Sequence, residues 1–144
     1  MITTADEALL RRAIAIAAHA ITLGDAPYGS LLADADGAIL IEAHNTVKRD
    51  NDISAHPELK LARWAARELE PEAAARTTMY TSCQPCEMCT GGIARSGLGR
   101  VVYALATRQY TELNPGSGWP VVPQEGPALF AEARVPIEAY YRRR

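Results

Sequence analysis

Two short stretches of the chain supply side chains that together suit a metal ion. His56-Pro57-Glu58 provides an imidazole and a carboxylate, and the segment 83–89 (CQPCEMC) provides thiols in the pattern Pro-Cys-x-x-Cys. One imidazole and two thiolates bind zinc well, and three protein ligands leave a fourth tetrahedral position open for water. The sequence therefore predicts one zinc site assembled from these two stretches, and the fold must bring them together.

Both stretches fall where a helix is expected to begin. Pro57 suits the first turn of a helix, because its missing N–H is no loss there, and apolar residues at helical spacing predict a helix over 57–69. Cys86 and Cys89 are three positions apart, so both sulfur atoms share one face of a helix that runs from about Cys86 to about Ser96. The amides and the dipole at such helix ends stabilise thiolates and other negative charges.

The other segments alternate between helical and extended patterns. The run Thr4-Ala5-Asp6-Glu7 fits a capping box, with Thr4 as the N-cap and Glu7 reaching back, and Gly24 suits the end of this first helix. Strands are expected at 29–33, 38–44, 77–81 and 100–104, a turn-rich loop at 114–120, a short helix at 127–133 and a last strand at 134–139. This alternation predicts a single α/β domain over residues 1–144.

Composition and charge limit the partners and the compartment. The net charge of −2 and the pI near 5.9 argue against a broad phosphate-binding surface, and Arg142-Arg143-Arg144 is interpreted as a solvated end. The three cysteines lie close together, which is typical of metal binding and not of a disulfide framework. The chain has no long apolar run and no secretory signal pattern, so we expect a cytoplasmic protein without a membrane span.

These residues resemble the cytidine deaminase superfamily, in which HxE followed by PCxxC is the signature of zinc deaminases of nucleobases. The resemblance runs from Pro27 to about Ala104. The run APYGSLL at 26–32 is similar to the corresponding segment of guanine, cytosine and tRNA-adenosine deaminases, and TSCQPCEMCTGGIARSG at 81–97 is most similar to guanine deaminases. Pro57 departs from these relatives, which usually have Ala between the His and the Glu.

The resemblance implies a fold, a cofactor and an assembly. The fold is a three-layer α/β/α arrangement around a mixed sheet of about five strands, and the cofactor is one Zn²⁺ per chain, held by His56, Cys86 and Cys89 with one coordination position open for water. A homodimer is also implied, in which the C-terminal part of the chain is exchanged and helps to close the pocket. No motif after Ala106 fixes this last expectation.

The implied activity is hydrolytic deamination of a free nucleobase or a similar aminated heterocycle (guanine-, cytosine- or s-triazine-like), with release of ammonia. Zinc lowers the pKa of its water, and Glu58 moves the protons. Asn45 stands at the spacing from His56 at which the resembling deaminases carry an Asn that hydrogen-bonds the base. The other candidates for substrate contacts are Tyr28, Trp119, Glu112 and Tyr140.

Alternatives remain open at this point. A nucleoside deaminase or a tRNA adenosine deaminase would share every catalytic residue, although the acidic pI disfavours nucleic acid. A closed site with Cys83 as a fourth ligand would make the protein a zinc-stabilised binding module that catalyses nothing. Against that reading, Pro85 restricts the loop between Cys83 and Cys86, and the resembling family uses only the two later cysteines. A redox role for the CxxC would leave His56 and Glu58 without purpose.

Overall fold

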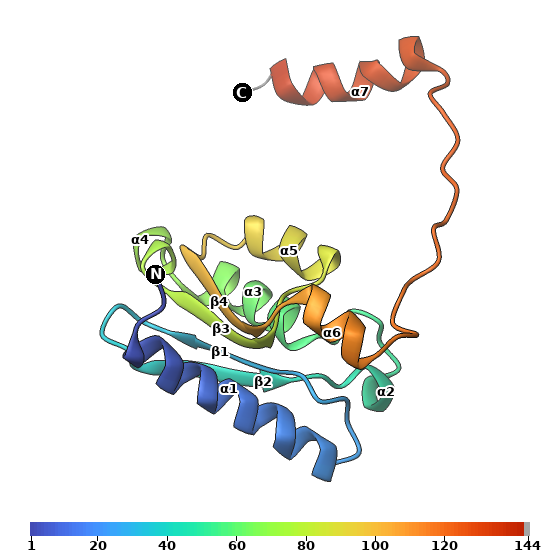
Figure 1. Cartoon of the computed structure of the whole chain (residues 1–144). Helices are drawn as coiled ribbons and strands as arrows, with labels where there is room; N and C mark the ends of the chain where they lie inside the picture. Colours follow the sequence, from blue (N-terminus) through green and yellow to red (C-terminus); the bar gives the residue numbers. More distant parts are fainter. Residues whose placement is uncertain (143–144) are drawn as a thin grey trace.

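A computed structural model of the chain describes residues 1–142 (Figure 1). Most of the expected tail, Arg143 and Arg144, lies outside these residues. The helices are α1 Thr4–Thr22, α2 Val47–Asp50, α3 Pro57–Glu68, α4 Pro71–Ala75, α5 Glu87–Ala94, α6 Thr107–Leu113 and α7 Phe130–Arg142. The strands are β1 Gly29–Ala33, β2 Ile39–His44, β3 Thr78–Cys83 and β4 Arg100–Leu105.

The strands form one mixed sheet in the order β2-β1-β3-β4. β1 runs antiparallel to both β2 and β3, whereas β3 and β4 are parallel. The parallel pair needs a crossover, and α5 supplies it between Cys83 and Arg100. The expected α/β fold with a mixed sheet is therefore confirmed, with four strands in the described part of the chain.

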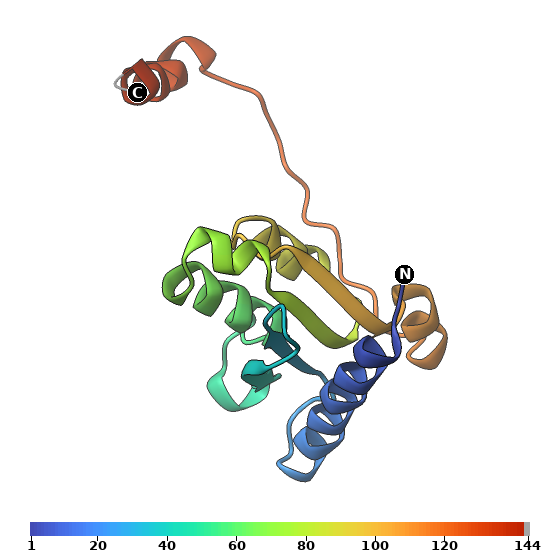
Figure 2. The ribbon, with the colours of Figure 1, turned by 90° about the vertical axis from the view of Figure 1, so that its left-hand side faces the viewer.

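Helices cover both faces of this sheet, as Figures 1 and 2 show. Successive residues of a strand point to opposite faces, so Leu31 and Leu32, both fully buried, serve two different cores. On the α1 face the buried cluster consists of Leu10, Leu31, Ala33, Tyr80 and Val102. On the face covered by α3 and α5 it consists of Leu32, Leu61, Ala65 and Met79. The layered arrangement that the resemblance implied is present.

The first helix begins one residue earlier than the sequence suggested. Thr3, and not Thr4, is the N-cap: its hydroxyl accepts from the Asp6 amide at 3.0 Å, and the Asp6 carboxylate accepts from the Thr3 amide at 2.9 Å. The sequence allows two overlapping capping boxes, Thr3 with Asp6 and Thr4 with Glu7, and contacts from distant residues favour the first. Arg100 donates twice to Asp6 at 2.9 Å and Tyr80 donates at 2.7 Å, so Asp6 is held at the helix start.

The C-terminal part differs most from expectation. The predicted strand at 134–139 is wrong, because these residues belong to α7, which also contains Pro136. Glu138 pairs with Arg134 and Arg142 at helical spacing, which supports a helix there. In Figures 1 and 2, α7 lies away from the sheet at the end of a long connection that follows α6.

Short helices were also missed. α2, α4 and α6 have four, five and seven residues, too few for an apolar period to show in the sequence. Among the described helices, none has both the length and the apolar character needed to cross a bilayer.

Candidate metal centre and active site

The three predicted metal ligands meet at the N-terminal ends of two helices. His56 is the N-cap of α3, Cys86 is the N-cap of α5, and Cys89 lies in the first turn of α5. His56 Nδ1 lies 3.7 Å from Cys86 Sγ and 3.5 Å from Cys89 Sγ, and the three ligand atoms all lie within 4.8 Å of one another. Packing of α3 against α5, in which Leu59 approaches Gly92, sets this convergence.

These distances fit a zinc ion. Tetrahedral bonds of about 2.3 Å to sulfur and about 2.0–2.1 Å to nitrogen place neighbouring ligand atoms roughly 3.5 Å apart. Burial, followed by the charge of Glu58, raises the pKa of the Cys89 thiol, and a coordinated cation reverses this effect by deprotonating the thiol. Both the donor set and its spacing therefore suit zinc with one coordination position left open.

Cys83 stands apart from this cluster in the described chain. It ends β3, is half-buried, and does not join the group of ligand atoms formed by His56, Cys86 and Cys89. Burial raises the pKa of its thiol, and the charge of Glu58 adds to the shift. The geometry does not favour the closed four-ligand site that the sequence left open.

Glu58 lies beside the ligand cluster and away from solvent. It is the second residue of α3, and only 6% of it is exposed. Burial raises the pKa of its carboxyl group, while the hydroxyl of Ser30, which lies 3.5 Å from Oε1, works in the opposite direction. The Ser30 hydroxyl oxygen also lies 2.7 Å from the Thr81 hydroxyl oxygen, so β1 and β3 fix the hydroxyl that faces the carboxylate.

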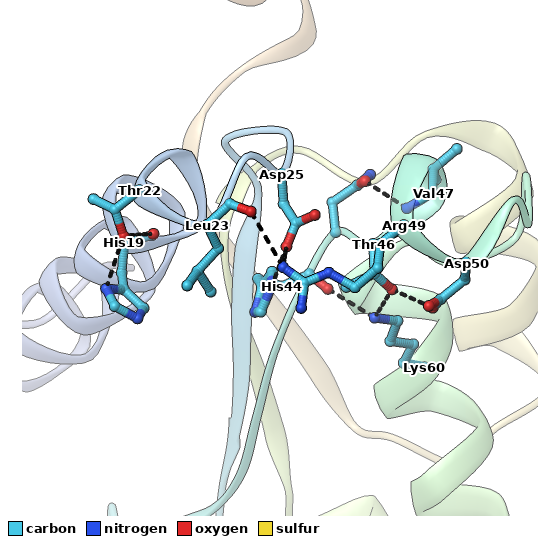
Figure 3. Close-up of polar contacts among 11 residues, drawn as sticks. His19, Thr22, Leu23, Asp25, His44, Thr46, Val47, Arg49, Asp50 and Lys60 are labelled. Carbon is cyan, nitrogen blue, oxygen red and sulfur yellow. Dashed lines mark hydrogen bonds and ion pairs between the residues drawn. The ribbon is translucent and has the colours of Figure 1, made fainter.

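Asn45 follows β2 and is buried near the start of β1. Its backbone N–H donates to the Tyr28 carbonyl at 3.1 Å, and its side-chain Oδ1 accepts from the backbone N–H of Val47 at 3.0 Å. Within residues 1–142 the side-chain NH₂ donates to no protein acceptor, so it is free to donate to a ligand. The residues on either side, His44 and Thr46, are tied to neighbouring elements (Figure 3).

Tyr28 is the one other predicted substrate contact that lies near the site. Burial, and then a hydrogen bond with Tyr110, raises the pKa of its hydroxyl, and the charges of Cys83 and Glu58 act in the same direction. The two hydroxyl oxygens are 2.6 Å apart, and the rings meet edge to face with centroids 6.0 Å apart. Sequence reasoning missed Tyr110, because α6 carries no motif and only the fold brings it to Tyr28.

The other three candidates do not reach the ligand cluster within one chain. Trp119 is 87% exposed and Tyr140 is 61% exposed, and both lie on the C-terminal part that extends from the sheet in Figure 1. Glu112 is exposed on α6. Their assignment as substrate contacts stays a prediction.

The fold and this site define a class of protein: a zinc enzyme of α/β architecture with one open coordination position and a buried carboxylate beside it. Residues 3–105 match the profile of the "Cytidine and deoxycytidylate deaminase zinc-binding region". The chain belongs to this family. It is a zinc-dependent hydrolase acting on C–N bonds.

Three of the relatives that the chain resembles are deaminases, and their names differ in the substrate. The chain is 33% identical to a probable cytosine deaminase of Schizosaccharomyces pombe over 90% of this chain and 74% of that protein. It is 33% identical to a tRNA-specific adenosine deaminase of Haemophilus influenzae over 68% of this chain and 57% of that protein. The X-ray structure of guanine deaminase from Bacillus subtilis superposes with a TM-score of 0.77 at 29% identity, covering 94% of this chain and 93% of that one.

Proposed function

We propose that the protein deaminates a free nucleobase or a closely similar aminated heterocycle, guanine-like first, with cytosine- and s-triazine-like rings as the next candidates. The observation that carries the proposal is the buried carboxylate of Glu58 beside the His56, Cys86 and Cys89 cluster. The superposition with a guanine deaminase over nearly the whole of both chains supports a guanine-like ring. All these rings present an amino group on a carbon next to a ring nitrogen.

In the proposed reaction, water adds to the amine-bearing ring carbon, the C–N bond breaks and the amino group leaves as ammonia. Zinc, when bound, supplies the Lewis acid that makes water nucleophilic near neutral pH. Glu58 accepts the proton of the attacking water and passes protons to the ring nitrogen and to the leaving amine. Burial raises the pKa of Glu58, which suits a carboxyl group that must hold a proton between these transfers.

Other side chains would orient the ring. The Asn45 side-chain NH₂ would donate to an acceptor on the heterocycle, and the ring of Tyr28 would lie against its face or edge. The Ser30 hydroxyl near Glu58 Oε1 would keep the carboxylate turned toward the reacting carbon.

A homodimer is part of the proposal. The side chains of α7 and of the connection before it are exposed in a single chain, including Trp119, Phe130 and Tyr140. A second copy that covered them would bury this apolar surface and would bring Trp119, Glu112 or Tyr140 to the partner's pocket. The clustered thiols also fit a reducing compartment, and we expect the protein to act in the cytoplasm.

The deciding experiment measures ammonia release by the zinc-loaded protein. The panel holds guanine, cytosine, adenine, their nucleosides, aminated triazines and a tRNA anticodon stem-loop, with Glu58→Ala as the control. Release from one free base that disappears in Glu58→Ala supports the proposal. Release from nucleosides or tRNA alone would contradict it in favour of a nucleoside or tRNA deaminase. Zinc bound at one per chain without any turnover would favour a zinc-stabilised binding module.

A further inference from the structure

Lys60 connects the helix that carries Glu58 to the segment that carries Asn45. Its backbone N–H donates to the His56 carbonyl at 3.0 Å, one helical turn back in α3. Its ammonium group donates to the His44 carbonyl at 2.9 Å and to the Thr46 hydroxyl at 2.6 Å, so it binds the residue on each side of Asn45 (Figure 3). Lys60 therefore links the first turn of α3, to which its backbone belongs, to the segment that contains Asn45, which its side chain binds.

The hydrogen bonds around Lys60 have consistent directions. The Thr46 hydroxyl donates its single proton to Asp50 at 2.6 Å, which leaves its lone pairs to accept from Lys60. The Thr46 N–H donates to the Ala55 carbonyl at 3.0 Å, immediately before His56. The segment is thus held at two points, by Lys60 of α3 and by Ala55, which immediately precedes the N-cap of α3.

The outer side of the same segment is held by the buried carboxylate of Asp25. Asp25 accepts from Arg49 at 2.7 Å and lies 3.0 Å from His44 Nε2, and its side chain is 3% exposed. Figure 3 shows the guanidinium group of Arg49 beside the side chains of Asp25 and His44. Because both flanking residues are fixed, the backbone of Asn45 has little freedom to move, and its side chain therefore keeps its direction.

Lysine suits this position better than arginine. Lys48 and Lys60 are the only lysines in the sequence, which has thirteen arginines. An ammonium group directs three donors from one atom, which lets it bind a carbonyl and a hydroxyl that lie on different sides, whereas a guanidinium group is a planar fork. Burial lowers the pKa of Lys60, although nearby Asp50 and Asp25 oppose the shift.

We propose that Lys60 is a positioning residue that fixes Asn45 relative to Glu58, and so sets how well the heterocycle is held for reaction. This inference rests on the proposed function, because it takes Asn45 as the group that orients the ring. Lys60 itself does not touch the reacting atoms. Its loss would leave the zinc ligands in place and would free the segment on which Asn45 sits.

The test compares Lys60→Met with Lys48→Met in the zinc-loaded protein. Lys48 is the matched control, because it lies on α2 in the same region, is exposed, and makes no side-chain hydrogen bond within residues 1–142. The first readout is the NMR order parameter of the Asn45 side-chain amide. The second is KM and kcat for the base that the wild-type protein deaminates, per zinc-loaded molecule, at a temperature well below the Tm.

We expect the order parameter of Asn45 to fall in Lys60→Met and to stay unchanged in Lys48→Met. The ratio kcat/KM should fall roughly ten- to a hundredfold, with most of the loss in KM and with zinc content retained. Thr46→Val removes one of the two acceptors and should show the same effects more weakly; it decides the question if Lys60→Met does not fold.

Two results would overturn the inference: an Asn45 amide as rigid as in the wild-type protein, or a lower Tm with unchanged kcat/KM. If the wild-type protein deaminates no base at all, the proposed function fails, and the order parameter of Asn45 still decides whether Lys60 positions it.

Discussion

His56 and Cys89 place Nδ1 and Sγ 3.5 Å apart, although 33 positions separate them in the chain. The contact exists because α3 and α5 cover the same face of the sheet with their N-terminal ends together. The first turn of each helix also contains an acidic residue, Glu58 in α3 and Glu87 in α5, whose negative charge the helix dipole favours there. The proposed zinc ligands therefore owe their spacing to helix packing, and not to a single continuous loop.

Removal of a proposed ligand should remove the metal. We expect Cys89→Ser to lower zinc content from about one per chain to a small fraction, because a hydroxyl is a poor replacement for a thiolate. Cys83→Ser is the matched control and should keep its zinc, since Cys83 lies outside the cluster. Elemental analysis after dialysis measures both variants. Equal zinc loss in both would revive the four-ligand site.

Replacement of Glu58 should separate chemistry from metal binding. Glu58→Gln keeps the shape of the side chain and loses proton transfer, so turnover should fall by about 10²–10⁴ while zinc content stays unchanged. Glu87→Gln is a suitable control, because Glu87 is an exposed acid in the first turn of α5. Steady-state ammonia release gives the comparison. A Glu58→Gln enzyme with a tenth or more of wild-type turnover would show that another group moves the protons.

The hydroxyl pair of Tyr28 and Tyr110 should matter for binding. Tyr110→Phe removes one partner of a half-buried hydrogen bond worth about 1 kcal/mol, which corresponds to roughly a fivefold rise in KM if Tyr28 contacts the ring. Tyr103→Phe, an exposed tyrosine on β4, should leave KM unchanged. If KM stays constant in Tyr110→Phe while the Tm falls, the pair serves packing alone.

The contact between Asp6 and Arg100 should make stability depend on pH. Hydrogen bonds from Arg100, and then from Thr3 and Tyr80, hold the pKa of Asp6 well below its usual range. A depressed folded-state pKa means that this stabilisation is complete above about pH 4, where an unfolded Asp ionises, and is lost as the pH falls toward the folded value. Asp6→Asn should therefore cost about 1–3 kcal/mol at pH 7 and progressively less below pH 4.

Denaturant unfolding of wild type and Asp6→Asn at several pH values checks this expectation. Asp36→Asn is a control at an exposed acid in the turn between β1 and β2. A difference between wild type and Asp6→Asn that stayed constant from pH 7 to pH 2 would mean that ionisation of Asp6 contributes nothing.

Much of the site was determined by short-range sequence. Pro57 after His56 and the Pro-Cys-x-x-Cys run are local signals, since a proline in a first turn and two thiols three residues apart act within one helical turn. They located both helix starts to within a residue, and they indicated zinc and the deaminase family correctly. The positions of the four strands followed from short runs of apolar and β-branched residues.

Tertiary structure decided what depended on distant partners. Thr3 became the N-cap instead of Thr4, because Asp6 is also bound by Arg100 and Tyr80 from the sheet. Tyr110 reached Tyr28, and Lys60 reached both neighbours of Asn45, through contacts that no local pattern encodes. The segment 134–139 became helical because no sheet edge of the described chain lies beside it, and ion pairs at helical spacing stabilise α7 instead. Local chemistry thus set the ligands and the helix starts, whereas only the packing of remote segments could set how the side chains around them are held.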